Sequence, residues 1–343
     1  MKTHLNTLYV TTQGAYLSKD GEAVLVRVDR EPKLRVPIHN LEGIVCFGNV
    51  SCSPFLMGHC GRNGVRISFL TEYGRFLARV QGPTSGNVLL RREQYRLADD
   101  LQRASLVARS IVLAKISNCR VVLLRARREH PGGDGEAKLR RASAELSRLG
   151  NAIPAVSTVG HLREIEGAAA RAYLGVIGEL LVKQREFFPF AHRSRRPPLD
   201  PFNALLSFLY TLLAHDVASG LEGVGLDPAV GFLHSMRPGR PSLALDLMEE
   251  LRPIVADRVA CSLINLRILK PGDFEREAAG AVSLRDEARK RVLAAYQKKK
   301  AEPLTHPFLG EKTTVGMLPH LQALLLARLI RGDIEGYPPF LAR

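Results

Sequence analysis

The first quarter of the chain carries short apolar runs and alternations with the two-residue period of β-strands. Residues 33–38 alternate, and Asp20-Gly21 is a hairpin turn signal before the run AVLVRV. The expected strands cover residues 5–12, 15–17, 23–28, 33–38, 43–47, 65–70 and 75–80. The pattern at 53–60 fits a short helix or a loop. Short strands joined by tight turns favour a small antiparallel β-sandwich.

Beyond the turn-forming segment QGPTSG at 81–86, apolar positions recur three and four residues apart, as in amphipathic helices. The expected helices cover residues 87–128, 137–149, 158–182, 202–214, 242–253, 254–265, 281–296 and 315–331. We therefore predict an α+β protein with a small N-terminal antiparallel β-sandwich and a larger all-α C-terminal domain. The predicted boundaries are a β-rich domain at 1–83, a linker at 84–92 and an α-helical domain at 93–343.

Local signals add detail to this outline. Ser242 is expected to cap the start of its helix, and Gly332 to end the last one, with a loose tail beyond it.

The N-terminal sequence MKTHLNTLYVTTQG has no apolar core of signal-peptide length. The apolar stretch ALLSFLYTLLA at 204–214 is too short to cross a bilayer. The five cysteines are irregularly spaced, which is typical of reduced thiols, so we expect a cytoplasmic protein with no membrane partner.

The charge balance points to a polyanionic partner. Lys and Arg number 49 against 34 for Asp and Glu, a net charge of +15. Such a basic chain favours nucleic acid first and an anionic membrane second, although a generally basic proteome produces the same balance. Aromatic residues are only 6%, so stacking on single-stranded bases is not favoured, and contact with the backbone and shape of double-stranded DNA is expected.

The stretch GFLHSMRPGRPSLALDLMEELRP at 231–253 contains the residue types of a metal site. His234 precedes a basic loop broken by Pro and Gly. Asp246 and Glu249 share one face of the helix that follows, with Glu250 near the same face. A His and carboxylates that meet at one point form a ligand set for a divalent cation. From these residues alone, a solvated acidic helix face with an unrelated surface His fits equally well.

A further carboxylate lies far upstream in sequence. Glu166 sits at the edge of the apolar stripe of the helix predicted at 158–182 and is followed by Gly167 and three alanines. Small residues let another helix approach closely, so Glu166 is a candidate for a helix interface. An ordinary surface glutamate is the alternative.

Taken together, four parts of the chain resemble a known family. The β-rich N-terminal part is followed by IEGAAARAYL, RRPPLDPFNALLSFLYTLL and GFLHSMRPGRPSLALDLMEELRP. In this order, and over essentially the whole chain, they resemble the Cas1 family of CRISPR-associated proteins, the endonuclease and integrase of spacer acquisition. The segment from His234 through SLALDLMEE is the most specific part. RPSLALDLMEELRP and the Lys-rich C-terminal helix look most like the type I-C subgroup.

The resemblance implies a Mg²⁺ or Mn²⁺ ion held by Glu166, His234 and Glu249. Many relatives have Asp at the position of Glu249, so the longer side chain here changes the coordination geometry. Asp246 matches a further acidic position near the metal, either beside the ligands or on a second ion. A general base is the alternative role for His234.

The basic residues around this stretch acquire a role from the same resemblance. Arg240 before the proline of the loop and Arg252 one turn after Glu249 match positions that lie near DNA in relatives, and Arg237 lies on the same loop as Arg240. All three are expected to neutralise phosphates next to the reacting one.

The resemblance also implies a reaction and an assembly. A free 3′-hydroxyl of a short DNA segment, the protospacer, attacks a phosphodiester at the edge of a CRISPR repeat, and cleavage uses water at the same site. The family forms homodimers, with most of the dimer contact expected in the β-rich domain. Two such dimers flank a Cas2 dimer, and a Cas4 nuclease is a further candidate partner.

Two other functional hypotheses each account for part of the sequence. A non-catalytic basic DNA-binding protein, architectural or regulatory, explains the charge but leaves Glu166, His234 and Glu249 without a role. A metallohydrolase acting on a small molecule explains those residues but not the charge.

Overall fold

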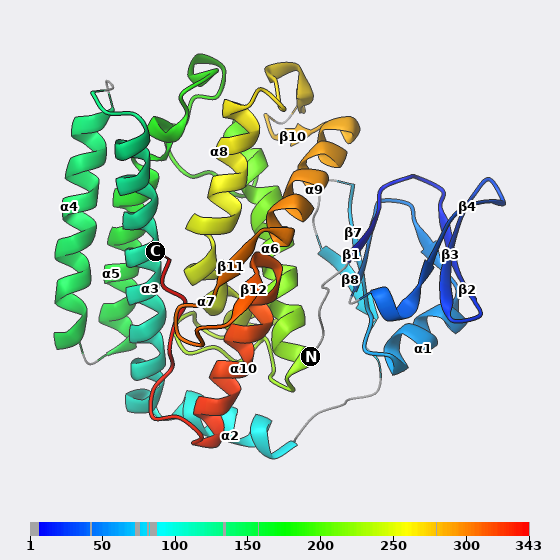
Figure 1. Cartoon of the computed structure of the whole chain (residues 1–343), viewed down its shortest axis with the longest axis horizontal. Helices are drawn as coiled ribbons and strands as arrows, with labels where there is room; N and C mark the ends of the chain where they lie inside the picture. The colour runs from blue at the N-terminus through cyan, green and yellow to red at the C-terminus, as the bar shows by residue number, and fades with distance from the viewer. Residues whose placement is uncertain are drawn as a thin grey trace. The chain divides into compact units, whose positions relative to one another are not determined.

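The computed structural model describes residues 7–41, 43–72, 76–80, 82, 88–132, 135–156, 158–278 and 280–342 (Figure 1). Residues 5–6 and 75 of the predicted strands, residues 84–87 of the predicted linker, and the predicted turn at 81–86 apart from Gly82 lie outside this set. The chain divides into two compact units. One comprises Met1–Gly86 with Leu284–Leu293, and the other Asn87–Ser283 with Ala294–Arg343. The sequence carries no signal for the return of Leu284–Leu293 to the first unit.

The N-terminal part of the first unit is built on two four-stranded sheets. The strands are β1 (Thr7–Val10), β2 (Tyr16–Asp20), β3 (Ala23–Val28), β4 (Glu31–Pro37), β5 (Gly43–Phe47), β6 (Ser51–Cys52), β7 (Arg66–Leu70) and β8 (Phe76–Val80). One sheet has the order β1-β5-β7-β8 and the other β4-β3-β2-β6. The predicted strands are therefore present, with β6 as an addition too short for a periodic signal.

The prediction of an antiparallel sandwich is wrong in strand direction. β1 pairs with β5, β5 with β7 and β2 with β6 in parallel, whereas β2–β3, β3–β4 and β7–β8 are antiparallel. The physical reason is the connection between β5 and β7, which contains the helix α1 (Pro54–Arg62). A crossover of this length lets two neighbouring strands run in the same direction. Alternation of side chains does not distinguish the two cases.

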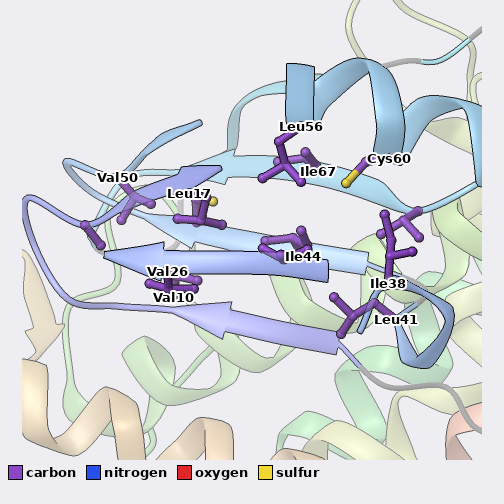
Figure 2. Packing of buried hydrophobic residues seen from close by; sticks show 14 residues of the cluster. Val10, Leu17, Val26, Ile38, Leu41, Ile44, Val50, Leu56, Cys60 and Ile67 are labelled. Carbon is purple, nitrogen blue, oxygen red and sulfur yellow. The ribbon is translucent and has the colours of Figure 1, made fainter. Parts of the chain in front are cut away.

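One apolar cluster joins the two sheets and α1. Val10 and Ile44 come from one sheet, Leu17 and Val26 from the other, and Leu56 from α1 (Figure 2). The Ser53 hydroxyl accepts a hydrogen bond from the Leu56 amide at 3.2 Å, which caps the start of α1. This cap and the buried Leu56 decide the open question at 53–60 in favour of a helix.

The second unit is mainly helical. Its helices are α2 (Val88–Asp99), α3 (Leu101–Glu129), α4 (Glu136–Ala152), α5 (Val159–Leu174), α6 (Pro201–Gly223), α7 (Ser242–Leu251), α8 (Arg258–Asn265), α9 (Asp286–Ala301, shared with the first unit) and α10 (Leu318–Arg331). The 29-residue α3 packs against α4, α5 and α7 (Figure 1). The helices that carry the candidate carboxylates, α5 with Glu166 and α7 with Glu249, therefore both pack against α3.

Several predicted boundaries in this unit need correction. Residues 88–92 of the predicted linker form the start of α2, because Leu90, Gln94 and Leu97 are buried along one side of it. The helix predicted at 87–128 is two helices, since Asp100 leaves the helical conformation and caps α3 by accepting from the amides of Gln102 and Arg103. The helix predicted at 158–182 ends at Leu174.

The second part of the chain is not all-α. Two-stranded sheets pair β9 (Phe274–Arg276) with β10 (Val282–Leu284) and β11 (Pro303–Thr305) with β12 (Lys312–Thr314). Each strand has three residues, which is too short for strand periodicity to register in the sequence.

The helix α6 is longer than its sequence suggests. With 23 residues it is long and apolar enough to cross a membrane, so the length argument used for 204–214 is wrong. The polar continuation HDVASGLEG extends the helix beyond the apolar stretch. Leu205, Leu206 and Leu209 are fully buried, and α6 packs against α7 and α10. Its apolar character is that of a core helix.

The C-terminal tail is anchored rather than loose. Gly332 ends α10 with a φ of 81°, as expected of a C-terminal glycine. Beyond it, the Tyr337 hydroxyl donates to Oε1 of Glu250 at 2.7 Å, and the Phe340 amide donates to Oε2 at 2.8 Å. On α3, Asn118 donates to the Phe340 carbonyl at 2.8 Å. The tail is therefore tied to both α3 and α7.

Candidate functional site

Asp246 on α7 organises the loop that precedes its own helix. Its side chain is fully buried and accepts hydrogen bonds from the amides of Phe232, Leu233 and His234 at 2.6, 2.9 and 2.8 Å. The same carboxylate lies 2.7 Å from Nδ1 of His234. Four donors converge on its two oxygens, so Asp246 holds the loop rather than facing outward with a free oxygen.

A glycine makes this wrapping possible. A Cβ built on Gly231 would lie 2.7 Å from Oδ2 of Asp246 and 2.8 Å from the carbonyl carbon of Ser242. Any larger residue would push the loop off the start of α7. Gly231 thus permits the close approach by which the three amides reach Asp246.

The contact with Asp246 also sets the state of the His234 ring. An ionised carboxylate only accepts, so Nδ1 carries the hydrogen and donates it. Nε2 is then the nitrogen with the free lone pair, and the ring is about 20% exposed. A carboxylate behind an imidazole in this manner is the usual support for a metal-binding or proton-accepting nitrogen.

The two predicted carboxylate ligands meet at a lysine. Nζ of Lys115, on α3, pairs with Oε1 of Glu166 on α5 and lies 2.6 Å from Oε2 of Glu249 on α7. The lysine side chain is only 6% exposed. Burial alone lowers the pKa of Lys115, but Glu249 and Glu166 outweigh it and raise the pKa, so the ammonium stays charged.

Glu249 is held between two cations. Its Oε1 lies 2.7 Å from Nη1 of Arg252, and its Oε2 faces Lys115. Burial by itself raises the pKa of Glu249, but Arg252, Lys115 and His234 together lower it to about 2. Glu249 is therefore ionised throughout the ordinary pH range. His234 contacts Asp246, which lies three residues before Glu249 on α7.

Arg252 is itself part of a buried network. Its guanidinium carbon lies 4.2 Å from the centroid of the Tyr210 ring, and the Tyr210 hydroxyl donates to Asp257 at 2.6 Å. Arg193 lies 5.4 Å from the same centroid. Arg252 thus positions Glu249, a role that its place in the sequence does not reveal.

The remaining residues of the stretch take different places. Arg237 is exposed and Arg240 half-buried on the loop, where Gly239 has a φ of 72°. Ser242 does not cap α7, because Pro241 holds the N-cap position and the Ser242 hydroxyl donates to the Ser235 carbonyl at 3.1 Å.

Glu250 lies away from the candidate site. Successive helical residues differ by 100° around the axis, so Glu250 turns from Glu249 toward α10 and the tail. It accepts from Gln322 at 3.0 Å in addition to Tyr337 and Phe340. Burial raises the pKa of Glu250 to about 8, although its three donors favour the charged form.

The structure therefore joins Glu166 and Glu249 through Lys115, while Asp246, one turn before Glu249 on α7, holds His234. Lys115 was missed by the sequence interpretation. Its only signal is a single cation among the apolar positions of IVLAKISNC on α3, and such a lysine is more commonly an exposed one.

The donor chemistry of the site suits a divalent cation. Glu166 and Glu249 supply hard carboxylate oxygens, and Nε2 of His234 is the ring nitrogen that Asp246 does not engage. Within that part of the chain, however, no three His, Cys, Asp or Glu side chains are already arranged to hold a metal. The cation that the two glutamates share in this arrangement is the ammonium of Lys115.

Comparison with known proteins places this geometry in a family. The family profile described as CRISPR associated protein Cas1 matches residues 8–298. The chain belongs to the Cas1 family. It is 54% identical over 343 residues to the CRISPR-associated endonuclease Cas1 1 of Chlorobaculum tepidum, covering 100% of both chains. It is also 35% identical over 343 residues to a Cas4 exonuclease/Cas1 endonuclease fusion of Geobacter sulfurreducens, covering 98% of this chain and 60% of the fusion.

Solved structures show the Cas1 fold as well. A Cas1 protein from Thermotoga maritima matches with a TM-score of 0.80 and 25% identity, covering 96% of this chain and 97% of that one. A casposase bound to an integration product matches with a TM-score of 0.84 and 21% identity, covering 99% and 95%. A chain of a Cas6-RT-Cas1–Cas2 complex matches with a TM-score of 0.83 and 23% identity, covering 98% of this chain and 36% of that one.

Proposed function

We propose that this Cas1 protein is a metal-dependent DNA endonuclease and integrase that inserts short foreign DNA segments into a CRISPR array. The proposal is supported by the contacts of Glu166 and Glu249, from separate helices, with Lys115, and by the contact of His234 with Asp246 one turn before Glu249. A non-catalytic DNA-binding protein would have no use for such a site, and the similarity to named Cas1 endonucleases over the full chain agrees with an enzyme.

In this proposal Glu166, Glu249 and Nε2 of His234 hold the cation. When bound, Mg²⁺ or Mn²⁺ would neutralise charge at the reacting phosphate and stabilise negative charge on the attacking and leaving oxygens. Asp246 keeps the hydrogen of His234 on Nδ1, and Arg252 keeps one oxygen of Glu249 engaged so that the other faces the site. The oxygens of Asp246 are fully used by the loop amides and His234, which favours a supporting role over a second ion.

The substrate is double-stranded DNA, as protospacer and as CRISPR repeat. Arg237 and Arg240 lie on the loop that precedes α7, and in this proposal they contact phosphates beside the reacting one. The net charge of +15 supports binding through the DNA backbone.

The proposed assembly is a homodimer, with dimer contact in the β-rich domain, that acts with a Cas2 dimer. The Cas1–Cas2 complex and the Cas4/Cas1 fusion among the similar proteins support Cas2 and Cas4 as partners. We also assign the chain to the type I-C subgroup, on RPSLALDLMEELRP and the Lys-rich end of α9, and to the cytoplasm.

The test is strand transfer. Purified protein with its cognate Cas2 is incubated with a short labelled duplex bearing free 3′-hydroxyls and a plasmid that carries the repeat array, with Mn²⁺, Mg²⁺ or a chelator. Covalent transfer of label to the repeat edge in either metal, and not with chelator, is the expected result. Tight DNA binding without any joining or cleavage would overturn the proposal in favour of an architectural protein.

A further inference from the structure

Lys115 is an unusual residue for its position. It lies in the interior of α3, where Ile111, Val112, Ile116 and Cys119 around it are all buried. A lysine in such surroundings is almost always paired, because an unpaired buried ammonium costs far more than the apolar contacts return. The buried ammonium of Lys115 therefore requires charged partners nearby.

Its partners are the two carboxylates assigned above to the metal. Nζ pairs with Oε1 of Glu166 and lies 2.6 Å from Oε2 of Glu249, so one ammonium joins α5 to α7 across α3. Arg252 takes the remaining oxygen of Glu249. The charges of Glu166 and Glu249 are thus offset by those of Lys115 and Arg252.

The other acid of the site offers no substitute. Asp246 is committed to three loop amides and to His234. A divalent cation entering the site thus depends on the same oxygens of Glu166 and Glu249 that the ammonium contacts. An ammonium and a metal ion cannot both lie within contact distance of one oxygen pair without strong repulsion.

We propose that Lys115 is a positioning residue that holds Glu166 and Glu249 together in the metal-free protein and competes with the metal for them. The inference rests on the proposed function, since it takes these glutamates as ligands. Metal binding then exchanges one cation for another on a preassembled pair of carboxylates. The metal-free protein is stabilised against the mutual repulsion of the two glutamates, and metal affinity is lowered by the competition.

The experiment is a Mn²⁺ titration of the full-length protein, with free Mn²⁺ followed by electron paramagnetic resonance and thermal unfolding measured in parallel. The variants are Lys115→Met, which removes the charge, and Lys115→Arg, which keeps it. Arg120→Met is the matched control, because Arg120 is exposed on the same helix and loses the same unit charge. We expect Lys115→Met to bind Mn²⁺ at least about tenfold more tightly than wild type, and to gain more in melting temperature from it. Lys115→Arg and Arg120→Met should stay near wild type.

Each result supports or contradicts competition between Lys115 and the metal. Equal or weaker Mn²⁺ binding by folded Lys115→Met overturns the inference while leaving the metal site intact. Absence of Mn²⁺ binding by wild type and Lys115→Met alike overturns the proposed metal site, and the inference with it. If Lys115→Met fails to fold without metal, Mn²⁺ should restore its native circular dichroism, since the ion replaces the missing cation. Failure of Mn²⁺ to do so contradicts the competition.

Discussion

Nδ1 of His234 lies 2.7 Å from Oδ1 of Asp246, and this contact fixes which nitrogen of the imidazole is free. Asp246→Asn leaves the shape of the side chain nearly unchanged, but it places an NH2 group, itself a donor, opposite hydrogen-bond donors. We expect strand transfer to fall by about 10- to 100-fold and stability by about 2 kcal/mol, because each oxygen of Asp246 serves two donors and both lose their acceptor. Reaction rates and chemical denaturation measure the two effects. Wild-type values for both would show that Asp246 supports neither His234 nor the loop.

The loop itself is tested at Gly231. A methyl group there meets Asp246 and the backbone of Ser242, so Gly231→Ala should destabilise the protein by about 1–3 kcal/mol and displace His234. Gly160→Ala on α5 is the control, since a Cβ at Gly160 meets nothing within 4 Å. Thermal unfolding and Mn²⁺ affinity measure the outcome. Equal behaviour of the two variants would contradict the close packing of the loop on α7.

Two arginines from the same stretch should behave differently. Arg252→Gln leaves Glu249 without one of its two cations and should cost about 3 kcal/mol of stability, with a rise in the pKa of Glu249. Arg237→Gln, on the exposed loop, should leave the melting temperature unchanged and lower the salt slope of DNA binding by about one. Unfolding and salt-dependent DNA titrations of both variants check this. The reverse pattern would mean that Arg252 faces DNA and Arg237 does not.

These contrasts show where sequence reasoning succeeds and where it stops. Period and turn chemistry identify the strands and helices, but they cannot tell that β1, β5 and β7 run parallel, because side-chain alternation is the same in either direction. The resemblance brings Glu166 to His234 and Glu249, which no local pattern does.

The roles of residues that act through tertiary contacts cannot be predicted from the sequence pattern. Lys115 is a single cation in a helix. Arg252 is expected from the resemblance to contact DNA, and Glu250 shares the apparent face of Glu249 until its partners in α10 and the tail are known. Their roles depend on elements distant in sequence, and a pattern confined to one element cannot contain them.

The anchor of the tail predicts a pH dependence. The pKa of Glu250 is raised to about 8, against about 4.3 in an unfolded chain. The folded protein therefore holds a proton that the unfolded chain has released. Stability from this group is full below about pH 4.3, declines by up to about 1.4 kcal/mol per pH unit as pH rises, and levels off above about pH 8.

Glu250→Gln tests this dependence, because an amide does not titrate. Denaturation of wild type and variant between pH 5 and 9 should give a wild-type stability that falls relative to the variant up to about pH 8 and runs parallel above it. A constant difference across this range would contradict the raised pKa.

Glu166→Ala, compared with Glu164→Ala on the same helix, tests most directly whether Glu166 and its partners form the reactive site. Glu164 is exposed, so its removal changes the same charge outside the site. With a branched DNA that reports the reverse of integration, in Mn²⁺, we expect wild-type activity for Glu164→Ala. We expect a loss of at least about a hundredfold for Glu166→Ala with DNA affinity retained. Equal activity of the two variants would contradict the account.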